Sequence, residues 1–236
     1  MKHSRWIVVS LAMAAVGSFV CWEFRPQPRP IIEGRPLVDW LREVEFEGSQ
    51  EKRAANEVLY AAGLRIIPEL SHLLLQRDST LIARAPVAWI PERMRVRYND
   101  QMKLKANAAW VISVIAHRDP GCTEVRGAVP SLIGGLSSRS AEVRYLSSQG
   151  LAAIGVSASN AVPALLLQTA DESSSVRLCA IEALGRIGSL PTESLRVVRA
   201  ALSDTNNDVR FVATQVLARL EKKPNGNPPK SLNQPP

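Results

Sequence analysis

The chain of 236 residues has few of the side chains from which catalytic and metal sites are usually built. Its three cysteines have no spacing typical of a metal site, and its three histidines lie far apart. It contains no HExxH, CxxC or GxSxG motif and no glycine-rich phosphate loop. We therefore expect no catalytic residue, no bound metal and no cofactor, and the chain is predicted not to be an enzyme. If the chain is exported, a disulfide between Cys122 and Cys179 is a possible alternative to free thiols.

Aromatic residues are also scarce, at 5% of the chain, whereas leucine and alanine are abundant. This composition favours helices over sheets. The formal net charge of +7 is compatible with nucleic acid, anionic lipid or acidic proteins as partners. Lysine and arginine do not gather into a dense patch, so nucleic acid is not the expected partner.

The N-terminal residues 1–24 are predicted to anchor the chain in a membrane. An apolar run extends from Trp6 to Trp22, and as a helix it would be about 25 Å long, slightly less than a hydrocarbon core of about 30 Å. Lys2 and Arg5 precede the run. Positive charge stays in the cytoplasm, so we expect a single-pass protein with its body on the outer, periplasmic or extracellular, side.

Two other fates of this segment stay open. Cleavage after Ala15-Val16-Gly17 would release a secreted protein, and Cys21 could carry a lipid. The next segment, 25–35, is rich in proline and is predicted to be a linker. At the other end, residues 221–236 are rich in proline and lysine and are predicted to be a disordered tail.

The central part of the chain repeats with a period of 33 residues. Segments 128–155, 161–188 and 194–220 align with one another at this constant offset, which is typical of stacked helical units. Each unit is predicted to hold two helices. In the second helix, apolar residues fall on one face of a 3.6-residue period: Val176, Ala180, Leu184 and Ile187.

Residues at the ends of these predicted helices support the assignment. Ser140, Ser173 and Asn206 are suitable N-caps of the second helices. Gly155 and Gly188 follow two of those helices and can adopt a left-handed conformation. Proline suits the first turn of the first helices, at positions 130 and 163.

Two more divergent units precede the regular ones. The first pairs a helix over 37–44 with one over 51–63, and the second pairs 66–76 with 104–116. Residues 77–101 form an insertion within the second unit. We therefore predict an all-α protein, an α-solenoid of about five helical hairpins over residues 36–220.

The pattern "VRLCAIEALGRIG" (176–188), with an aspartate ahead of it, resembles HEAT repeats, in particular the short bacterial type shared with phycobilisome lyase-like proteins. In that family the aspartate and arginine positions form hydrogen bonds between neighbouring units. The resemblance implies that Asp171 pairs with Arg177 and Asp204 pairs with Arg210. Position 138 is a serine, so the unit at 128–155 departs from the pattern.

The resemblance also implies that the second helices line a concave face. Their outward positions form a row that contains Glu57, Trp110, Gln149, Glu182 and Gln215. Trp110 is notable there because exposed aromatic residues often anchor interfaces, although a packed tryptophan is an equal alternative. A second row is apolar and is expected to pack between units: Tyr145, Leu178 and Phe211.

The insertion offers a second candidate surface, because it places arginines beside an aromatic residue: Trp89, Arg93, Arg95 and Arg97. Such a set suits acidic or planar groups. We expect a membrane-anchored, non-catalytic scaffold that binds another protein through the concave face, the insertion or both. The alternative is an enzyme or enzyme accessory on a HEAT-like scaffold, similar to bilin lyases or helical-repeat DNA glycosylases.

Overall fold

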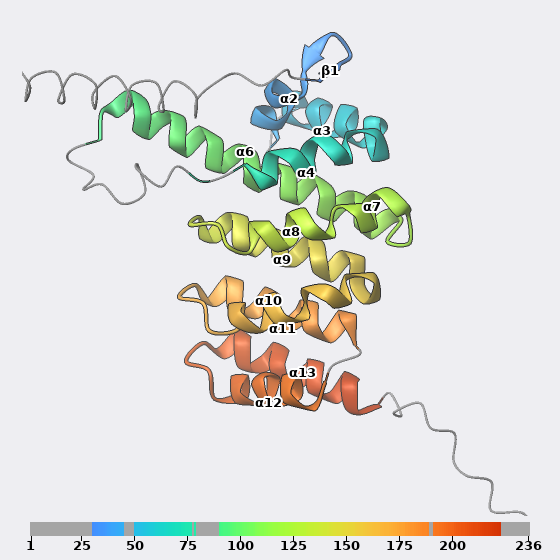
Figure 1. Ribbon diagram of the computed structural model, residues 1–236, viewed down its shortest axis with the longest axis vertical. Coiled ribbons are helices and arrows are strands. Elements are labelled where there is room, and N and C mark those ends of the chain that lie inside the picture. Colours follow the sequence, from blue (N-terminus) through green and yellow to red (C-terminus); the bar gives the residue numbers. More distant parts are fainter. Residues whose placement is uncertain (1–29, 45–49, 77, 79–89, 189–190, 223–236) are drawn as a thin grey trace, which may run out of the picture.

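The computed structural model describes residues 30–44, 50–76, 78, 90–188 and 191–222, and these form a stack of helical hairpins in chain order (Figure 1). The prediction of an all-α solenoid is confirmed. The predicted membrane segment and the predicted C-terminal tail beyond Lys222 lie outside the described residues. So does Trp89 of the insertion.

Five hairpins make up the described stack, and we number them as units from the N-terminus. They pair α2 (Leu37–Glu43) with α3 (Gln50–Ala62), α4 (Ile67–Leu75) with α6 (Glu92–Arg118), α8 (Val129–Gly135) with α9 (Ala141–Ile154), α10 (Val162–Gln168) with α11 (Ser174–Ile187), and α12 (Thr192–Ala200) with α13 (Asn207–Lys222). Short elements connect them: η1 (Gly63–Ile66), α7 (Thr123–Gly127), η3 (Gly155–Ala161) and η4 (Ala201–Ser203).

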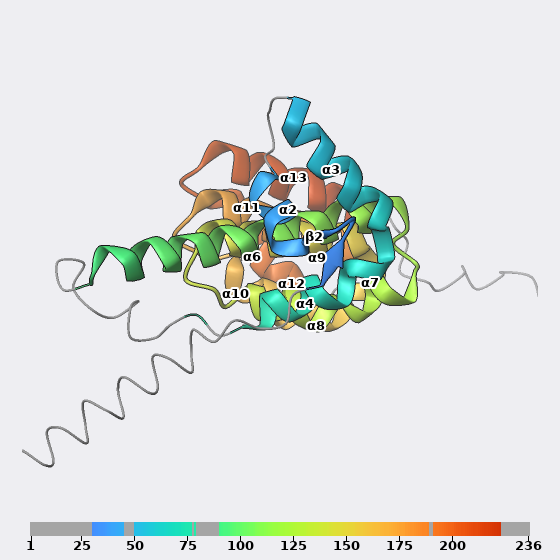
Figure 2. The same ribbon diagram turned by 90° about the horizontal axis from the view of Figure 1, so that it is seen from above.

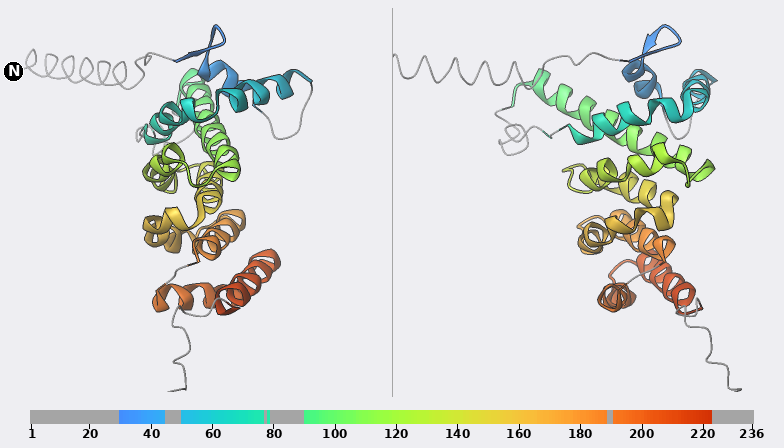
Figure 3. Two further views of the ribbon diagram at one scale, coloured as in Figure 1. Left: turned by 90° about the vertical axis from the view of Figure 1, so that its right-hand side faces the viewer. Right: turned by 45° about the vertical axis from the view of Figure 1, so that its right-hand side comes forward.

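The first helices lie on one side of the stack and the second helices on the other (Figure 3). The most extensive helix contacts join successive second helices, α6 with α9, α9 with α11, and α11 with α13. The apolar stripe predicted for the second helices is fully buried, since Val143, Val176, Leu184 and Val209 are 0% exposed. A single continuous core therefore runs through the stack, as stacked units require.

The predicted helix ends are largely present. The hydroxyl of Ser140 accepts a hydrogen bond from the backbone N–H of Val143, and the side chain of Asn206 caps α13 in the same way. Ser173 is also an N-cap residue, but its side chain makes no cap bond. Gly188 ends α11 in the left-handed conformation, with φ 76° and ψ −26°, which glycine adopts without strain.

A small hairpin precedes the first unit. Strands β1 (Ile31–Ile32) and β2 (Arg35–Pro36) pair antiparallel, and the turn between them has positive φ at Glu33 and Gly34. The indole N–H of Trp40 donates to the carbonyl of Ile32 at 3.0 Å. Residues 30–35, which we assigned to the linker, are thus folded onto α2, because this turn and the Trp40 contact outweigh the proline signal.

Helix α6 is longer than the sequence predicted. It begins at Glu92 and not near Leu104, so residues 92–101 of the predicted insertion continue directly into the second helix of the unit. Its N-terminal half projects from the stack (Figures 1 and 2). Tyr98 is half-buried and Met102 is buried, and this face holds the projecting part to the body.

Two described helical runs, Ala54–Leu75 and Ala141–Gln168, are long and apolar enough to cross a membrane. Each run consists of consecutive solenoid elements that change direction at a glycine with positive φ, Gly63 in the first and Gly155 in the second. Both runs are therefore parts of the stacked hairpins. Cys122 and Cys179 are free thiols in this structure.

Candidate functional site

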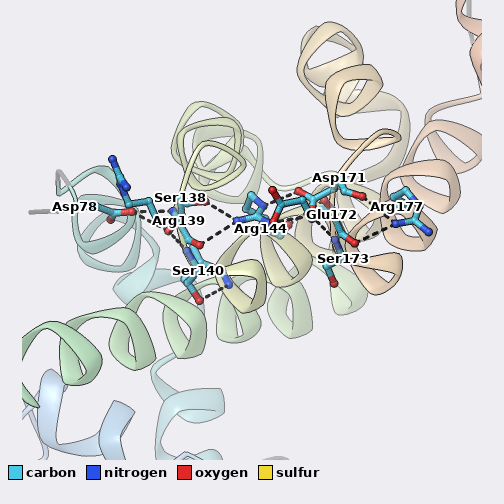
Figure 4. A network of polar contacts seen from close by, with 11 residues as sticks. Asp78, Ser138, Arg139, Ser140, Arg144, Asp171, Glu172, Ser173 and Arg177 are labelled. Carbon is cyan, nitrogen blue, oxygen red and sulfur yellow. Dashed lines mark hydrogen bonds and ion pairs between the residues drawn. The ribbon is translucent and has the colours of Figure 1, made fainter. Parts of the chain in front are cut away.

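Arginine–aspartate pairs join successive units of the solenoid (Figure 4). The Nε and Nη2 atoms of Arg144 donate to the two carboxylate oxygens of Asp171, at 2.6 and 2.8 Å. Arg177 binds Asp204 in the same way, with both distances 2.8 Å. Each pair joins the second helix of one unit to the turn of the next. Such two-pronged bonds between charged groups are strong and fix geometry, so they set the stacking register. We call this series of pairs the ladder.

The pairing differs from the one that the resemblance implied. Within a unit the arginine reaches only the backbone of the aspartate: Nη1 of Arg177 donates to the carbonyl of Asp171 at 2.9 Å, and Nη1 of Arg210 to that of Asp204 at 2.7 Å. The carboxylate points toward the preceding unit because it also accepts a backbone N–H two residues further along the chain. For Asp171 that donor is Ser173, at 2.9 Å.

Asp78 completes the ladder where the regular aspartate is missing. Ser138 stands at that position, and Oδ2 of Asp78 accepts hydrogen bonds from its hydroxyl at 3.0 Å and from the backbone N–H of Arg139 at 3.1 Å. Oδ1 of Asp78 lies 2.5 Å from Nζ of Lys105, which also donates to the carbonyl of Gln76. Lys105 therefore binds a carboxylate and a backbone carbonyl, as an arginine does in the regular units, but here the carboxylate belongs to the same unit and reaches the third unit through Ser138 and Arg139.

These contacts keep the ladder carboxylates ionised. Burial desolvates Asp78 and Asp171, which by itself would raise their pKa values, but the hydrogen bonds and opposite charges around them, led by the hydrogen bonds from Lys105 and Arg144, together outweigh it and hold both pKa values below the ordinary range. The hydrogen bond from Arg177 is the main reason why the pKa of Asp204 is also lowered. The ladder is thus a structural feature and not a source of titrating groups at neutral pH.

The second helices carry the predicted recognition row, and we call their outward surface the second-helix face. A cleft of about 290 Å³ opens on it between α6 and α9. It is lined by Trp110, Glu142, Tyr145, Leu146 and Gln149. The cleft brings together two predicted residues, Trp110 and Gln149, and combines aromatic surface with one carboxylate and one amide. Such a concave mixture is typical of binding sites.

Trp110 is held in place from the N-terminal side of the cleft. Its ring lies 6.3 Å from that of Tyr60, at an interplanar angle of 43°. The guanidinium of Arg118 in turn lies over the ring of Tyr60, 4.9 Å from its centroid. Trp110 is half-buried and packs against the core, so both expected roles, packing and exposure, apply to it.

Three residues of the cleft were not predicted as binding residues. We expected Tyr145 to serve mainly as packing, and the predicted row did not include Glu142 or the buried Leu146. Burial, together with the nearby Cys179 and Glu182, raises the pKa of Tyr145, so its phenol is neutral and can donate a hydrogen bond. The spacing of Glu142, Tyr145 and Gln149 at i, i+3 and i+7 is a signal that could have placed them on one helix face.

The rest of the row continues beyond the cleft. Glu182 on α11 forms an ion pair with Arg186 at 3.0 Å, and Gln215 on α13 is exposed. Glu57 on α3 is exposed as well. Phe211 does not pack between units as we expected: its side chain is 64% exposed, because no described unit follows α13 to cover it.

The insertion residues lie away from the cleft. Arg93, Arg95 and Arg97 are exposed on the projecting half of α6. This half is fastened to the first unit, since the guanidinium of Arg42 donates to both oxygens of Asp100, at 3.2 and 2.8 Å. The described residues contain no group of three or more histidine, cysteine, aspartate or glutamate side chains that could hold a metal ion.

The fold and the ladder define a class, the helical-repeat solenoids, in which each unit is fixed to its neighbour by repeated contacts. Residues 129–218 match the family model of HEAT repeats. The resemblance deduced from the 33-residue pattern is thereby confirmed. No curated protein matches the chain.

Solved structures share the fold at low sequence identity. The chain is 18% identical to a protein in the complex of CpcE and CpcF of phycocyanin lyase from Nostoc sp. PCC7120, with a TM-score of 0.52, over 77% of this chain and 97% of that chain. It is 19% identical to a designed armadillo repeat protein in complex with peptide (KR)4, with a TM-score of 0.43, over 78% of this chain and 99% of that one. The likeness to the lyase complex protein shows the fold alone.

Proposed function

We propose that the protein is a membrane-anchored, non-catalytic scaffold whose second-helix face binds a segment of a partner protein. The observation that carries this proposal is the cleft between α6 and α9, where Trp110 and Tyr145 lie with Glu142 and Gln149. Aromatic side chains with polar neighbours supply much of the energy of protein interfaces. The cleft lies on two packed helices, so a partner would meet a rigid surface.

The surroundings of the cleft favour an extended partner segment. Successive second helices present Gln149, Glu182 and Gln215 at equivalent positions, one per unit. A chain lying across the helices would meet these side chains in sequence, with Trp110 at one end. Polar residues of this kind provide register and specificity, and the aromatic anchor provides affinity.

The chemistry of the cleft supports binding and not catalysis. The phenol of Tyr145 has a raised pKa, so it is a hydrogen-bond donor at neutral pH. Burial raises the pKa of the nearby Cys179 thiol to about 12, which keeps it protonated and unreactive. The alternative, an enzyme or enzyme accessory similar to the phycocyanin lyase subunits, would require a reactive group at this face.

The projecting half of α6 provides a second contact surface in this proposal. Its exposed arginines, Arg93, Arg95 and Arg97, suit an acidic partner. Residues 1–24 would hold the whole solenoid beside a membrane, with its body on the outer side. Full-length protein should then resist extraction by high salt, since an apolar span binds far more tightly than charge does. Release by high salt would contradict the proposed membrane anchor, but it would not bear on the proposal for the second-helix face.

A crosslinking experiment in intact cells tests the binding face. A photoreactive amino acid at Gln149 should capture a partner, and the Trp110→Ala substitution should reduce the yield at least fivefold. The matched control position is Leu167 on α10, which is 75% exposed on the side of the first helices. The proposal would be refuted if both positions captured a partner equally well, or if Trp110→Ala left the crosslinking yield at Gln149 unchanged.

A further inference from the structure

The ladder stops at Arg210 in the part of the chain that the structure describes. Nη1 of Arg210 donates to the carbonyl of Asp204 in its own unit, as Arg177 does to that of Asp171 and Arg144 to that of Ser138. Arg144 and Arg177 use their remaining N–H groups to hold a carboxylate of the next unit. Nη2 of Arg210 instead donates to the amide oxygen of Asn207, in its own helix. No described carboxylate binds Arg210.

A second observation points to the same end of the stack. Tyr145 and Leu178 stand two periods and one period before Phe211 and are half-buried against the core. Each of them is followed by another second helix, α11 or α13. Phe211 is 64% exposed. An uncovered aromatic ring therefore lies next in sequence to an arginine that lacks its carboxylate.

We propose that this end of the solenoid is a docking surface for a partner protein that presents an aspartate or glutamate side chain to Arg210 and an apolar side chain to Phe211. The partner takes the place of the next unit. The ladder specifies its chemistry, because an arginine in this position binds a carboxylate in both preceding units. This surface is separate from the cleft at Trp110. Gln215 on the same helix belongs to the second-helix face, but the inference rests on Arg210 and Phe211 and does not depend on the proposed function.

Two other occupants fit the charges less well. Residues 223–236 contain two lysines and no aspartate or glutamate, so none of their side chains can supply the carboxylate. Glu221 lies on α13 itself, eleven residues or about 16 Å further along the helix than Arg210. A second copy docked through the same end would bring like charges together, because Arg210 would lie on both sides of the contact.

Thermal unfolding of the full chain tests whether the end is free. Arg177→Gln should lower the melting temperature by roughly 4–8 °C, because it removes a bidentate charged pair. Arg210→Gln should lower it by less than half as much. Equal losses would show that Arg210 is already engaged within the chain and would overturn the proposal.

An extended chain tests whether the end accepts a carboxylate in register. A second copy of residues 188–220 is inserted between Leu220 and Glu221, so that the copied Asp204 follows Arg210 by 27 residues, as in the Arg177–Asp204 pair. The extra unit should raise the melting temperature by several degrees. Replacing the copied aspartate by asparagine should remove most of this gain in melting temperature. In a protein that already carries Arg210→Gln, the same replacement should cause no further loss, because the aspartate then has no arginine to bind. The inference would be overturned if the extra unit gave no gain, or if the losses from the two substitutions were additive.

Photocrosslinking in intact cells tests the partner itself. A benzoyl-phenylalanine in place of Phe211 should give a product whose crosslinked partner peptide contains or adjoins an acidic residue. Arg210→Gln should reduce the yield at least fivefold, and Arg219→Gln on the same helix is the matched control that should not. A yield no higher than that from position 167, or one equally reduced by both substitutions, would overturn the proposal.

Discussion

The carboxylate of Asp78 lies 2.5 Å from the ammonium group of Lys105, and the two side chains are only 13% and 5% exposed. Asp78 comes from the predicted insertion, whereas Lys105 belongs to the regular second helix α6. The irregular segment thus supplies the charge that Ser138 lacks. A segment that looks like an interruption of the repeat therefore completes the contact between the second and third units.

The Asp78→Asn substitution should lower the free energy of unfolding by about 3 kcal/mol. It leaves Lys105 buried without a counter-charge, and breaking one side of a buried pair typically costs about 3–5 kcal/mol. The double change Asp78→Asn with Lys105→Met should cost less than the single one, since no charge then stays buried. Urea denaturation of the three proteins measures both effects.

The control for this prediction is the exposed pair of Arg42 and Asp100, whose side chains are 42% and 40% exposed. Asp100→Asn should cost less than about 1 kcal/mol, because solvent screens such pairs. If Asp78→Asn and Asp100→Asn destabilise the protein equally, Asp78 has no special role in holding the insertion to the stack.

The ladder should make stability depend on pH in the acid range. The folded-state pKa values of Asp78, Asp171 and Asp204 are lowered. Groups of this kind contribute stability that is complete above the ordinary pKa of about 4 and is lost as the pH falls through the lower folded-state value. The melting temperature should therefore decrease when the pH is lowered below about 4. The variant Asp171→Asn with Asp204→Asn should melt lower at pH 7 and show a shallower fall in acid. Calorimetry at pH 7, 5, 4 and 3 measures both effects. If the melting temperature of the variant falls as steeply in acid as that of the unchanged protein, the ladder carboxylates are not the cause of the pH dependence.

The regular part of the fold could be predicted because the same physical constraint recurs every 33 residues. Val176 and Leu184 are completely buried, as the 3.6-residue period indicated, and the prolines at 130 and 163 lie in the first turns of α8 and α10. Packing between like units requires like residues at like positions. Sequence alone is then sufficient to place the helices and their buried faces.

The irregular contacts could not be predicted in this way. Asp78 meets Ser138 and Lys105 through space, across separations of 60 and 27 residues, and no periodic pattern marks it. The ladder pairs were assigned within units because the pattern gives positions and not directions. Which of two neighbouring units a carboxylate faces depends on the turn that orients it, here the N–H of Ser173 for Asp171.

The close approach of α11 and α13 gives the last prediction. A Cβ atom added at Gly185 would lie 2.7 and 2.8 Å from the two methyl groups of Val216, far inside normal contact. Alanine is favoured over glycine within helices by up to about 1 kcal/mol, but overpacking of a tight core costs about 1–3 kcal/mol. Gly185→Ala should therefore destabilise the protein by about 1–2 kcal/mol in urea denaturation. Combined with Val216→Ala it should cost less than the sum of the two single changes, because the clash disappears. Gly127→Ala, where nothing lies within 4 Å of the added atom, is the matched control and should be neutral or slightly stabilising. A neutral Gly185→Ala would mean that the two helices stand further apart than described.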